Sequence, residues 1–512
     1  MCKPRFRSSS VSRATSAMAL ALLMAGCVGL PRHVEKSHSD AFARPETTSL
    51  GRIAAREQVN KSLSGIHLLA SGEEALADLI ALADHAERTL DIQYYIVHED
   101  NSARLLLHHV RLAADRGVRV RVLVDDLNTA GEDRRFLHLS EHANVEVRVF
   151  NPFAGGRFAT WTRFLLSVTD IRRINHRMHN KLFVADNALA ITGGRNIGDE
   201  YFTRDPKYNF IDLDVVAAGV IVPELSASFD AFWNSKYAYP IASLAWPVRA
   251  ETASPPLPES ATPTSANWLG AELDSGNLHL TWVPATVLAD RPAKIAGEDS
   301  ADEELTIDND LATLMLSSKH ELIVISPYFV PGKEGVAMFA KLEGQGVHIR
   351  ILTNSLASTD SPLVHNGYAR YRVALLKLGV ELSEVRPKLG QKRARFHPFR
   401  SSNASLHAKA LVIDQRTVFI GSQNMDARSA RTNSELGLVM RSAEIARQVT
   451  SLLDDISADG SYKLQLLDHS DKIEWSSGEP GEEKTWYTDP ETTRLQRFSL
   501  KVLAPFAPEE LL

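Results

Sequence analysis

The sequence predicts an α/β protein built from two similar halves, each a mainly parallel β-sheet flanked by helices. Three observations support this prediction. Apolar runs of strand length alternate with helical periodicity, the same order of elements and polar motifs occurs twice, and a proline-rich stretch separates the two copies. A chain of 512 residues is also too long for one core of ordinary size.

A strand–helix–strand unit opens each copy. The elements are a strand at 90–97, a helical stretch to 114 and a strand at 118–124 in the first copy, and a strand at 322–330, a helical stretch through 342 and a strand at 347–352 in the second. This order is typical of βαβ units, in which helices cover parallel strands.

Changes in composition divide the chain further. Proline alternates with Ser, Thr and Ala at 250–266, which indicates a surface linker, and a polar stretch before the first copy indicates a tether. The predicted order is a signal at 1–27, a tether at 28–62, a first half at 63–248, a linker at 249–267, a second half at 268–462 and a tail at 463–512 that is a candidate membrane-facing segment.

The N-terminus has the features of a targeting signal. Basic residues precede an apolar run at 17–25 that is too short to span a bilayer, and 23–27 resembles a bacterial lipoprotein signal with Cys27 as the acylation site. An ordinary signal with an incidental thiol is the alternative. Cleavage would also remove Cys2, leaving no disulfide or cysteine metal cluster in the mature domains. We therefore expect a lipid-anchored protein of the bacterial envelope. Val28 favours the outer membrane over the periplasmic face of the inner membrane.

The repeated polar residues carry the chemistry. Four residues in each copy share one offset of 228 positions (407 − 179, for example): His179, Lys181, Asp186 and Asn196 correspond to His407, Lys409, Asp414 and Asn424. A carboxylate follows each motif, at Asp212 and at Glu435. A single histidine beside a lysine is usually structural, but two copies in one register favour a catalytic pair.

These residue types suit cleavage of a phosphodiester. Residues i and i+2 of a strand share a face, so each histidine lies beside its lysine. Lysine and asparagine donors stabilise the negative charge that grows on the phosphoryl oxygens. One imidazole can attack phosphorus while the other protonates the leaving alkoxide, so the scheme needs no metal and no cofactor.

The duplicated H-x-K-x4-D pattern resembles the phospholipase D superfamily, and the strings at 178–181, 193–202 and 287–294 are most similar to lipoprotein-like bacterial cardiolipin synthases. The resemblance implies that both halves pack around one shared active site. It implies that His179 forms a phosphohistidine and that His407 acts as acid and base.

The resemblance also implies that Asp212 and Glu435 orient the imidazoles through Nδ1, and that Asp186 and Asp414 are mainly structural supports. One position departs from the family pattern. Gly194 stands where the second copy has Ser422, which puts a hydroxyl contribution from the first half in doubt.

Three further segments have two interpretations each. The aromatic segment at 153–166 either contacts lipid or, more commonly for such patterns, packs in the core, and the same holds for 498–506. The basic and aromatic segment at 388–400 either recognises anionic headgroups or is a solvated charged loop.

The expected function is a phosphatidyltransferase that makes cardiolipin at the membrane from phospholipids such as phosphatidylglycerol. A phospholipase D hydrolase that releases phosphatidic acid is the alternative, and a secreted nuclease is third. The net charge of −6 disfavours nucleic acid as a partner. An intact double motif gives little support to a purely lipid-binding role, and a helper protein remains an open possibility.

Overall fold

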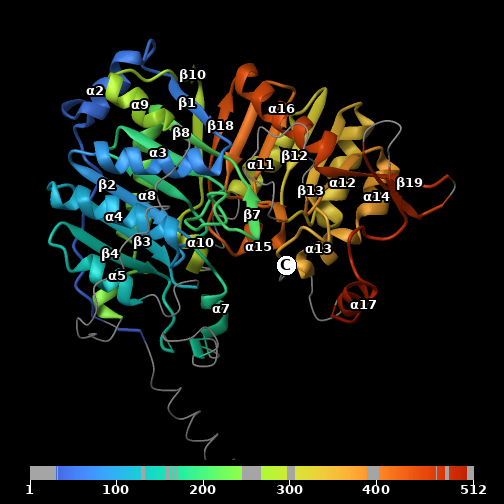
Figure 1. Ribbon diagram of the computed structural model, residues 1–512, viewed down its shortest axis with the longest axis horizontal. Coiled ribbons are helices and arrows are strands. Elements are labelled where there is room, and N and C mark those ends of the chain that lie inside the picture. The colour runs from blue at the N-terminus through green and yellow to red at the C-terminus, as the bar shows by residue number, and fades with distance from the viewer. Residues whose placement is uncertain are drawn as a thin grey trace, which may run out of the picture.

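The computed structural model describes residues 30–31, 33–127, 133–156, 162–163, 167, 170–244, 267–296, 306–388, 403–468, 470–478 and 484–503 of the chain. The expected signal with Cys27 and nearly all of the proline-rich linker lie outside the described residues. The two halves lie side by side, each a sheet with helices packed on it (Figure 1). The predicted α/β class with two similar halves is confirmed.

The first sheet has the strand order β10-β1-β8-β6-β5-β2-β3-β4-β9. Its elements are η1 (Pro45–Thr47), α2 (Ser49–Glu57), β1 (Ser64–Leu69), α3 (Gly72–His85), β2 (Thr89–Tyr94), α4 (Asn101–Asp115), β3 (Arg119–Asp125), α5 (Asp133–Ser140), β4 (Val145–Phe150), α7 (Ile171–Ile174), β5 (Leu182–Ala185), β6 (Leu189–Gly193), β8 (Asp214–Gly219), α8 (Ile221–Trp233), β9 (Ala238–Pro240), η3 (Ile241–Ser243), α9 (Trp268–Ser275) and β10 (Thr281–Val283).

The second sheet has the order β11-β18-β17-β16-β12-β13-β14-β19-β20-β21. Its elements are β11 (Ala285–Ala289), α10 (Pro292–Ala296), α11 (Ile307–Leu316), β12 (Glu321–Ile325), α12 (Gly332–Gly344), β13 (His348–Asn354), α13 (Pro362–Ala369), α14 (Arg372–Leu378), β14 (Glu381–Val385), β16 (Ala410–Ile413), β17 (Thr417–Gly421), α15 (Ala427–Arg431), β18 (Leu436–Arg441), α16 (Ala443–Asp459), β19 (Ser461–Leu466), β20 (Ile473–Ser477), β21 (Lys484–Trp486) and α17 (Arg494–Leu503).

The strand directions correct one expectation, because the sheets are mixed and not mainly parallel. Only the neighbours β2–β3–β4 and β12–β13–β14 are parallel among the described strands of the two large sheets, and the other pairs are antiparallel. The reason lies in the motifs themselves. Each motif strand turns back at once through a tight turn, and tight turns join antiparallel strands. Asp186 and Asn187 have positive φ in the first turn, as Asp414 and Gln415 do in the second.

The turn aspartates also fix the start of the neighbouring parallel strand. Asp186 accepts backbone hydrogen bonds from residues 87, 88 and 89 at 3.0, 2.7 and 2.9 Å. Asp414 accepts equivalent bonds from residues 319, 320 and 321. Both carboxylates therefore satisfy backbone donors at the end of the motif strand that lies away from its histidine.

The linker does not separate the two sheets as we expected. Residues 268–283 were assigned to the second half, but α9 packs on α3 and β10 pairs with β1 of the first sheet. Leu269 and Leu273 of α9 are buried there, so the helix completes the first core. The tail expected at 463–512 also begins as strands, because β19, β20 and β21 extend the second sheet.

A continuous apolar core joins the halves. It contains Phe232 and Trp233 of α8 together with Leu436 of β18 and Val449 of α16. A small parallel sheet also joins them, with β7 (Tyr208–Ile211) from the first half and β15 (Asn403–Leu406) from the second. No helix among the described residues combines the length and apolar character needed to cross a bilayer.

Candidate active site

Backbone pairing between the halves brings the two motifs together. In the β7–β15 pair Leu406 lies opposite Ile211, so the residues that follow them, His407 and Asp212, become neighbours. The His407 amide donates to the Ile211 carbonyl at 2.8 Å. An isolated parallel bridge does the same for the other histidine.

That bridge joins Met178 to Ser434, and the His179 amide donates to the Ser434 carbonyl at 2.9 Å. His179 and Glu435 are thereby placed side by side. In both cases a residue just before the histidine is paired with a residue just before the carboxylate of the other half. The backbone therefore determines which acid meets which histidine.

The resulting carboxylate–imidazole pairs cross between the halves. His179 Nδ1 lies 2.8 Å from Glu435 Oε2, and His407 Nδ1 lies 2.6 Å from Asp212 Oδ2. All four side chains are buried. A carboxylate that accepts the Nδ1 proton fixes the tautomer and leaves the Nε2 lone pair available. The expected contacts through Nδ1 are present, with each acid supplied by the opposite half.

Aromatic rings hold both imidazoles from the side. Tyr95 packs edge-on against His179 with ring centroids 4.9 Å apart. Tyr201 and Phe210 pack against His407 at 5.2 and 4.8 Å. No sequence pattern marks these rings as site residues, although Tyr201 lies in a string that carries the family resemblance.

Each motif lysine is folded back beside its own histidine. Lys181 Nζ donates to the His179 carbonyl at 2.6 Å, and Lys409 Nζ donates to the His407 carbonyl. Burial lowers the pKa of Lys181 to about 7 and that of Lys409 to about 8, although nearby carboxylates oppose the shift. Two ammonium groups in one buried site favour an anionic ligand.

The histidines and acids respond to burial in opposite ways. Burial lowers the pKa of His179 to about 4, outweighing the attraction of Glu435, and burial also lowers the pKa of His407. Burial alone would raise the pKa of Asp212 and Glu435, but the adjacent imidazoles and lysines hold both below their ordinary values. At neutral pH the free site therefore contains neutral imidazoles and ionised carboxylates.

The departure at Gly194 has a steric cause. A Cβ built there would lie 2.1 Å from Asp212 Oδ1, so a serine does not fit. Ser422 in the second half donates to Glu435 and accepts from the Leu436 amide. In the first half the Leu213 amide donates directly to Asp212 Oδ1 at 2.8 Å, so a backbone group replaces the missing hydroxyl.

The motif asparagines differ in their partners. The Asn196 side-chain oxygen accepts from the Ile96 amide at 3.3 Å. The Asn424 side-chain oxygen is buried and accepts no hydrogen bond from the described residues. Asp186 and Asp414, which we included among the site residues, lie in the turns at the far ends of the motif strands.

Two supporting residues were not identified from the sequence. Buried Arg195 donates to the Asp212 carbonyl at 2.6 Å and pairs with Asp214. The Asp290 carboxylate accepts from the Glu435 amide at 3.0 Å, and the Asp290 amide donates to the Glu435 carbonyl at 3.0 Å. Both lie in strings that carry the family resemblance, which was the available signal.

Comparison with known proteins matches this chain to cardiolipin synthases, both by family and by individual relatives. The family described as "Cardiolipin synthase, PLD-like domain" matches residues 79–233 and 311–456. The chain is 38% identical over 463 residues to cardiolipin synthase C of Escherichia coli strain K12, covering 88% of this chain and 96% of that protein. It is 25% identical over 413 residues to cardiolipin synthase 1 of Bacillus anthracis, covering 80% and 68%.

The fold is similar to that of solved structures, among them one that covers most of this chain. It is the phosphatidylserine synthase of Haemophilus influenzae Rd KW20, with a TM-score of 0.56 and 15% sequence identity, and the match covers 90% of this chain and 100% of that one.

We predict that Gly194→Ala lowers kcat/KM for a phosphodiester about a hundredfold or more, because the added methyl group displaces Asp212 from His407. Asp212→Asn should cause a loss of similar size. Gly344→Ala is the matched control, since a Cβ at that position meets no atom within 4 Å. Steady-state kinetics on folded variants measure both effects. Near-normal activity of Gly194→Ala would contradict the positioning role of Asp212.

Proposed function

This chain belongs to the phospholipase D-like family that includes the cardiolipin synthases, and on that premise we propose that it is a phosphatidyltransferase that makes cardiolipin. The phosphatidyl group would pass through a phosphohistidine to a headgroup hydroxyl of a second phospholipid. The observation that carries this proposal is the crossed pair of buried imidazoles, each held by a carboxylate of the other half.

In the first step Nε2 of His179 attacks phosphorus, and the bond from phosphorus to the leaving alkoxide breaks. His407 gives its Nε2 proton to that alkoxide. Nucleophilic attack requires an unprotonated imidazole, and the lowered pKa of His179 supports this role. The anionic phosphodiester favours the protonated form of His407 once it is bound.

In the second step the acceptor hydroxyl gives its proton to His407 and attacks phosphorus, and the bond between phosphorus and nitrogen breaks. Lys181, Lys409 and the amides of Asn196 and Asn424 would stabilise the phosphoryl oxygens in both steps. Their effect is largest in a buried site, where water does not screen the charges.

Transfer and hydrolysis use the same catalytic groups and differ only in the acceptor. A transferase must hold a lipid hydroxyl against the intermediate and keep water away from the line of attack. The names of the cardiolipin synthase relatives favour transfer, and phosphatidylglycerol is the acceptor and donor that we propose. Hydrolysis to phosphatidic acid remains the competing function.

The aromatic segment 153–166 and the basic segment 388–400 precede the two motifs in the sequence, but the described residues do not connect either segment to the choice between transfer and hydrolysis. Phe153 is 1% exposed and packs against the guanidinium groups of Arg163 and Arg177, which is a core role. Trp161 and Arg395 lie outside the described residues. A role for either segment in holding the acceptor therefore stays a prediction.

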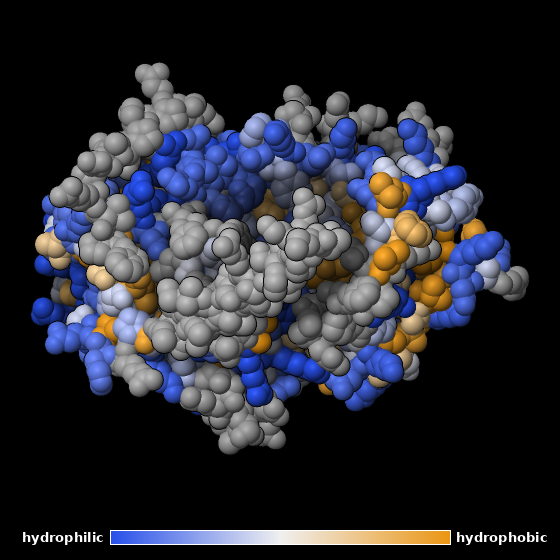
Figure 2. All heavy atoms as spheres, turned by 90° about the horizontal axis from the view of Figure 1, so that it is seen from below, coloured by the Kyte–Doolittle hydropathy of each residue, from blue (hydrophilic) through white to orange (hydrophobic). Residues whose placement is uncertain are grey.

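Membrane attachment is a further part of the proposal. Helix α17 exposes Leu495 and Phe498 to 75% and 65%, and it carries three basic residues and no acidic one. Such a face suits the surface of an anionic bilayer. Figure 2 shows hydrophobic residues gathered on this side of the second half.

The position of α17 also relates it to the site. It packs on α13, which begins at Pro362. Asp360, just before α13, accepts from Tyr328 at 2.6 Å and acts electrostatically on buried Lys409. A bilayer bound to α17 would therefore lie near the active-site side of the second half. The proposed lipid anchor at Cys27 would act in addition.

The central experiment is a product and labelling assay. We predict that phosphatidylglycerol vesicles yield mainly cardiolipin and glycerol, and that His179→Ala and His407→Ala each abolish turnover. Label from ³²P-phosphatidylglycerol should remain on the His407→Ala protein and be absent from His179→Ala. Phosphatidic acid as the dominant product would replace the synthase with a hydrolase, and the reverse labelling pattern would exchange the two histidine roles.

The pH profile follows from the shifted pKa values. kcat/KM for a soluble phosphodiester should rise as pH increases through about 4, where His179 loses its proton. As pH rises further, kcat/KM should fall because His407 loses the proton that the leaving group needs. The midpoint of this alkaline limb should lie below the ordinary histidine pKa of 6.5. Initial rates in constant ionic strength buffers measure both limbs. An acidic limb at 6.5 or above would contradict the nucleophilic role of a buried, neutral His179.

Membrane attachment can be tested on protein with and without the anchor. We predict that Leu495→Glu with Phe498→Glu weakens sedimentation with anionic vesicles at least tenfold, because two apolar side chains leave the bilayer. Val59→Glu is the control, since Val59 is 92% exposed elsewhere. Palmitate labelling should mark wild-type protein and fail on Cys27→Ser. Unchanged vesicle binding of the double variant would exclude α17 as the contact.

A further inference from the structure

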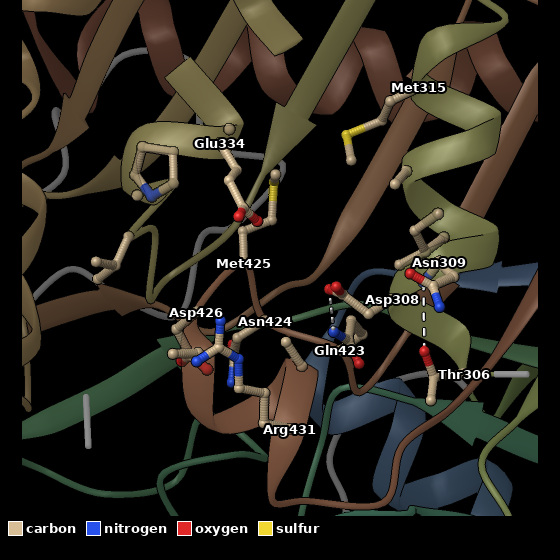
Figure 3. Close-up of a pocket in the computed structure, with 18 of the residues that line it drawn as sticks. Thr306, Asp308, Asn309, Met315, Glu334, Gln423, Asn424, Met425, Asp426 and Arg431 are labelled. Carbon is tan, nitrogen blue, oxygen red and sulfur yellow. Dashed lines mark hydrogen bonds between the residues drawn. The ribbon is translucent and has the colours of Figure 1, made fainter. Parts of the chain in front are cut away.

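A cavity of about 1700 Å³ lies beside the proposed catalytic groups, on the side of the second half. Its lining comes from α11, α12, α15 and strands β16 and β17 (Figure 3). Arg172 of α7 in the first half also lines it. Asn424 of the second motif lines it. The cavity therefore reaches one motif asparagine, and the proposed catalytic steps assign it no role.

The equivalent place in the first half can be identified from the backbone. Val97 forms a parallel bridge with Ile197, and Phe329 forms the same bridge with Met425. The next residues repeat the pattern, because the amide of His98 donates to Ile197 and the amide of Val330 donates to Met425. These bridges superimpose the start of α4 on the start of α12.

In the first half this place is closed by hydrogen bonds. Asp199 accepts from the Ser102 amide at 2.9 Å and from the Ser102 hydroxyl at 2.6 Å. Asp100 accepts from the Asp199 amide at 2.7 Å. The turn after the first motif is therefore tied to the N-terminus of α4.

The second half lacks this closure. By the same register Asp199 corresponds to Ala427, Asp100 to Gly332 and Ser102 to Glu334, and all three counterparts line the cavity. Alanine and glycine have no side-chain acceptor, so the hydrogen bonds that tie the first half do not form. The cavity lies where the duplicated halves differ at these positions.

The lining suits a long amphiphile, because it is part apolar and part charged. Leu311, Met315 and Met338 form an apolar wall, and charged residues of both signs complete the lining, among them Arg172, Arg431, Asp308 and Glu334. The volume exceeds the roughly 300–1,000 Å³ of an ordinary small-molecule pocket.

The end of the cavity near the motif is polar. The side-chain oxygens of Gln423 and Asn424 are buried and accept no hydrogen bond from the described residues. Figure 3 shows both side chains below Met315 of α11. Unpaired buried acceptors at this point suit the glycerol hydroxyls of the phosphatidylglycerol headgroup, because the phosphatidyl group itself offers no hydrogen-bond donor.

We propose that this cavity holds the acyl chains of the phosphatidyl group that is being transferred. This inference rests on the proposed function and names the part of the substrate that each half handles. Arg172 and His176, which line the cavity, belong to the segment that leads directly into His179. In this proposal a phosphatidyl group attached to His179 keeps its chains in the cavity while the acceptor arrives. In the first half the equivalent place carries the hydrogen bonds between Asp199 and Ser102 instead.

Filling the cavity tests this assignment. Ala312 of α11 lines it and is half-buried, whereas Thr313, the next residue of the same helix, is exposed and does not line it. Ala312→Phe should lower kcat/KM for dioleoyl phosphatidylglycerol at least tenfold. The same variant should hydrolyse bis(4-nitrophenyl) phosphate, which has no acyl chain, within twofold of wild type. Thr313→Phe should leave both activities within twofold.

Two outcomes would overturn the proposal: Ala312→Phe acting on the long-chain lipid within twofold of wild type, or an equal loss on both substrates.

A second measurement, by crosslinking, does not depend on turnover. Phosphatidylglycerol with a diazirine at the end of one acyl chain should crosslink to peptides from α11 and α12 of the wild-type protein, and crosslinks confined to other segments would contradict the proposal. Wild-type protein that cleaves the soluble diester but no lipid would instead refute the proposed function, and the crosslinking result would still decide the cavity.

Discussion

The exchange of carboxylates between the halves is the constraint on which the rest of the structure depends. Glu435 serves His179 and Asp212 serves His407, across 256 and 195 residues of sequence. Each acid is ionised and buried, so removing its imidazole partner would cost the carboxylate one charge-assisted hydrogen bond, about 1.5–3 kcal/mol. Neither half contains a complete site by itself. A chain with both halves in one polypeptide satisfies this requirement without dimerisation.

Rigid backbone pairing makes the exchange precise. The β7–β15 pair places His407 beside Asp212, and the bridge between Met178 and Ser434 places His179 beside Glu435. Both placements are determined by the backbone. The apolar core shared by α8, β18 and α16 fixes the halves behind these pairings. The lysines then need only short side-chain bonds to their own histidine carbonyls to remain in place. Such preorganisation is what electrostatic stabilisation of a phosphoryl group requires.

The two copies carry the same His, Lys, Asp and Asn in their motifs, but they differ in the residues around them. Gly194 and Ser422 satisfy the same kind of carboxylate in two ways, one with a backbone amide and one with a hydroxyl. In the first half Asp199 accepts hydrogen bonds from Ser102 at the start of α4. The second half has Ala427 at the corresponding position, where it lines the cavity. These differences allow two similar halves to take different tasks. A nucleophile and an acid–base catalyst need similar surroundings, whereas two successive lipids need different ones.

The sequence by itself determined the α/β class, the duplication and the polar residues of the site. These features are local or one-dimensional: strand and helix periodicity, and one offset that relates His179 to His407. Tertiary structure decided which acid meets which histidine, because that contact depends on pairing between distant strands. It also decided the mixed strand directions, the assignment of α9 and β10 to the first sheet, and the cavity, since each depends on which buried surfaces and hydrogen-bond donors meet after the chain has folded.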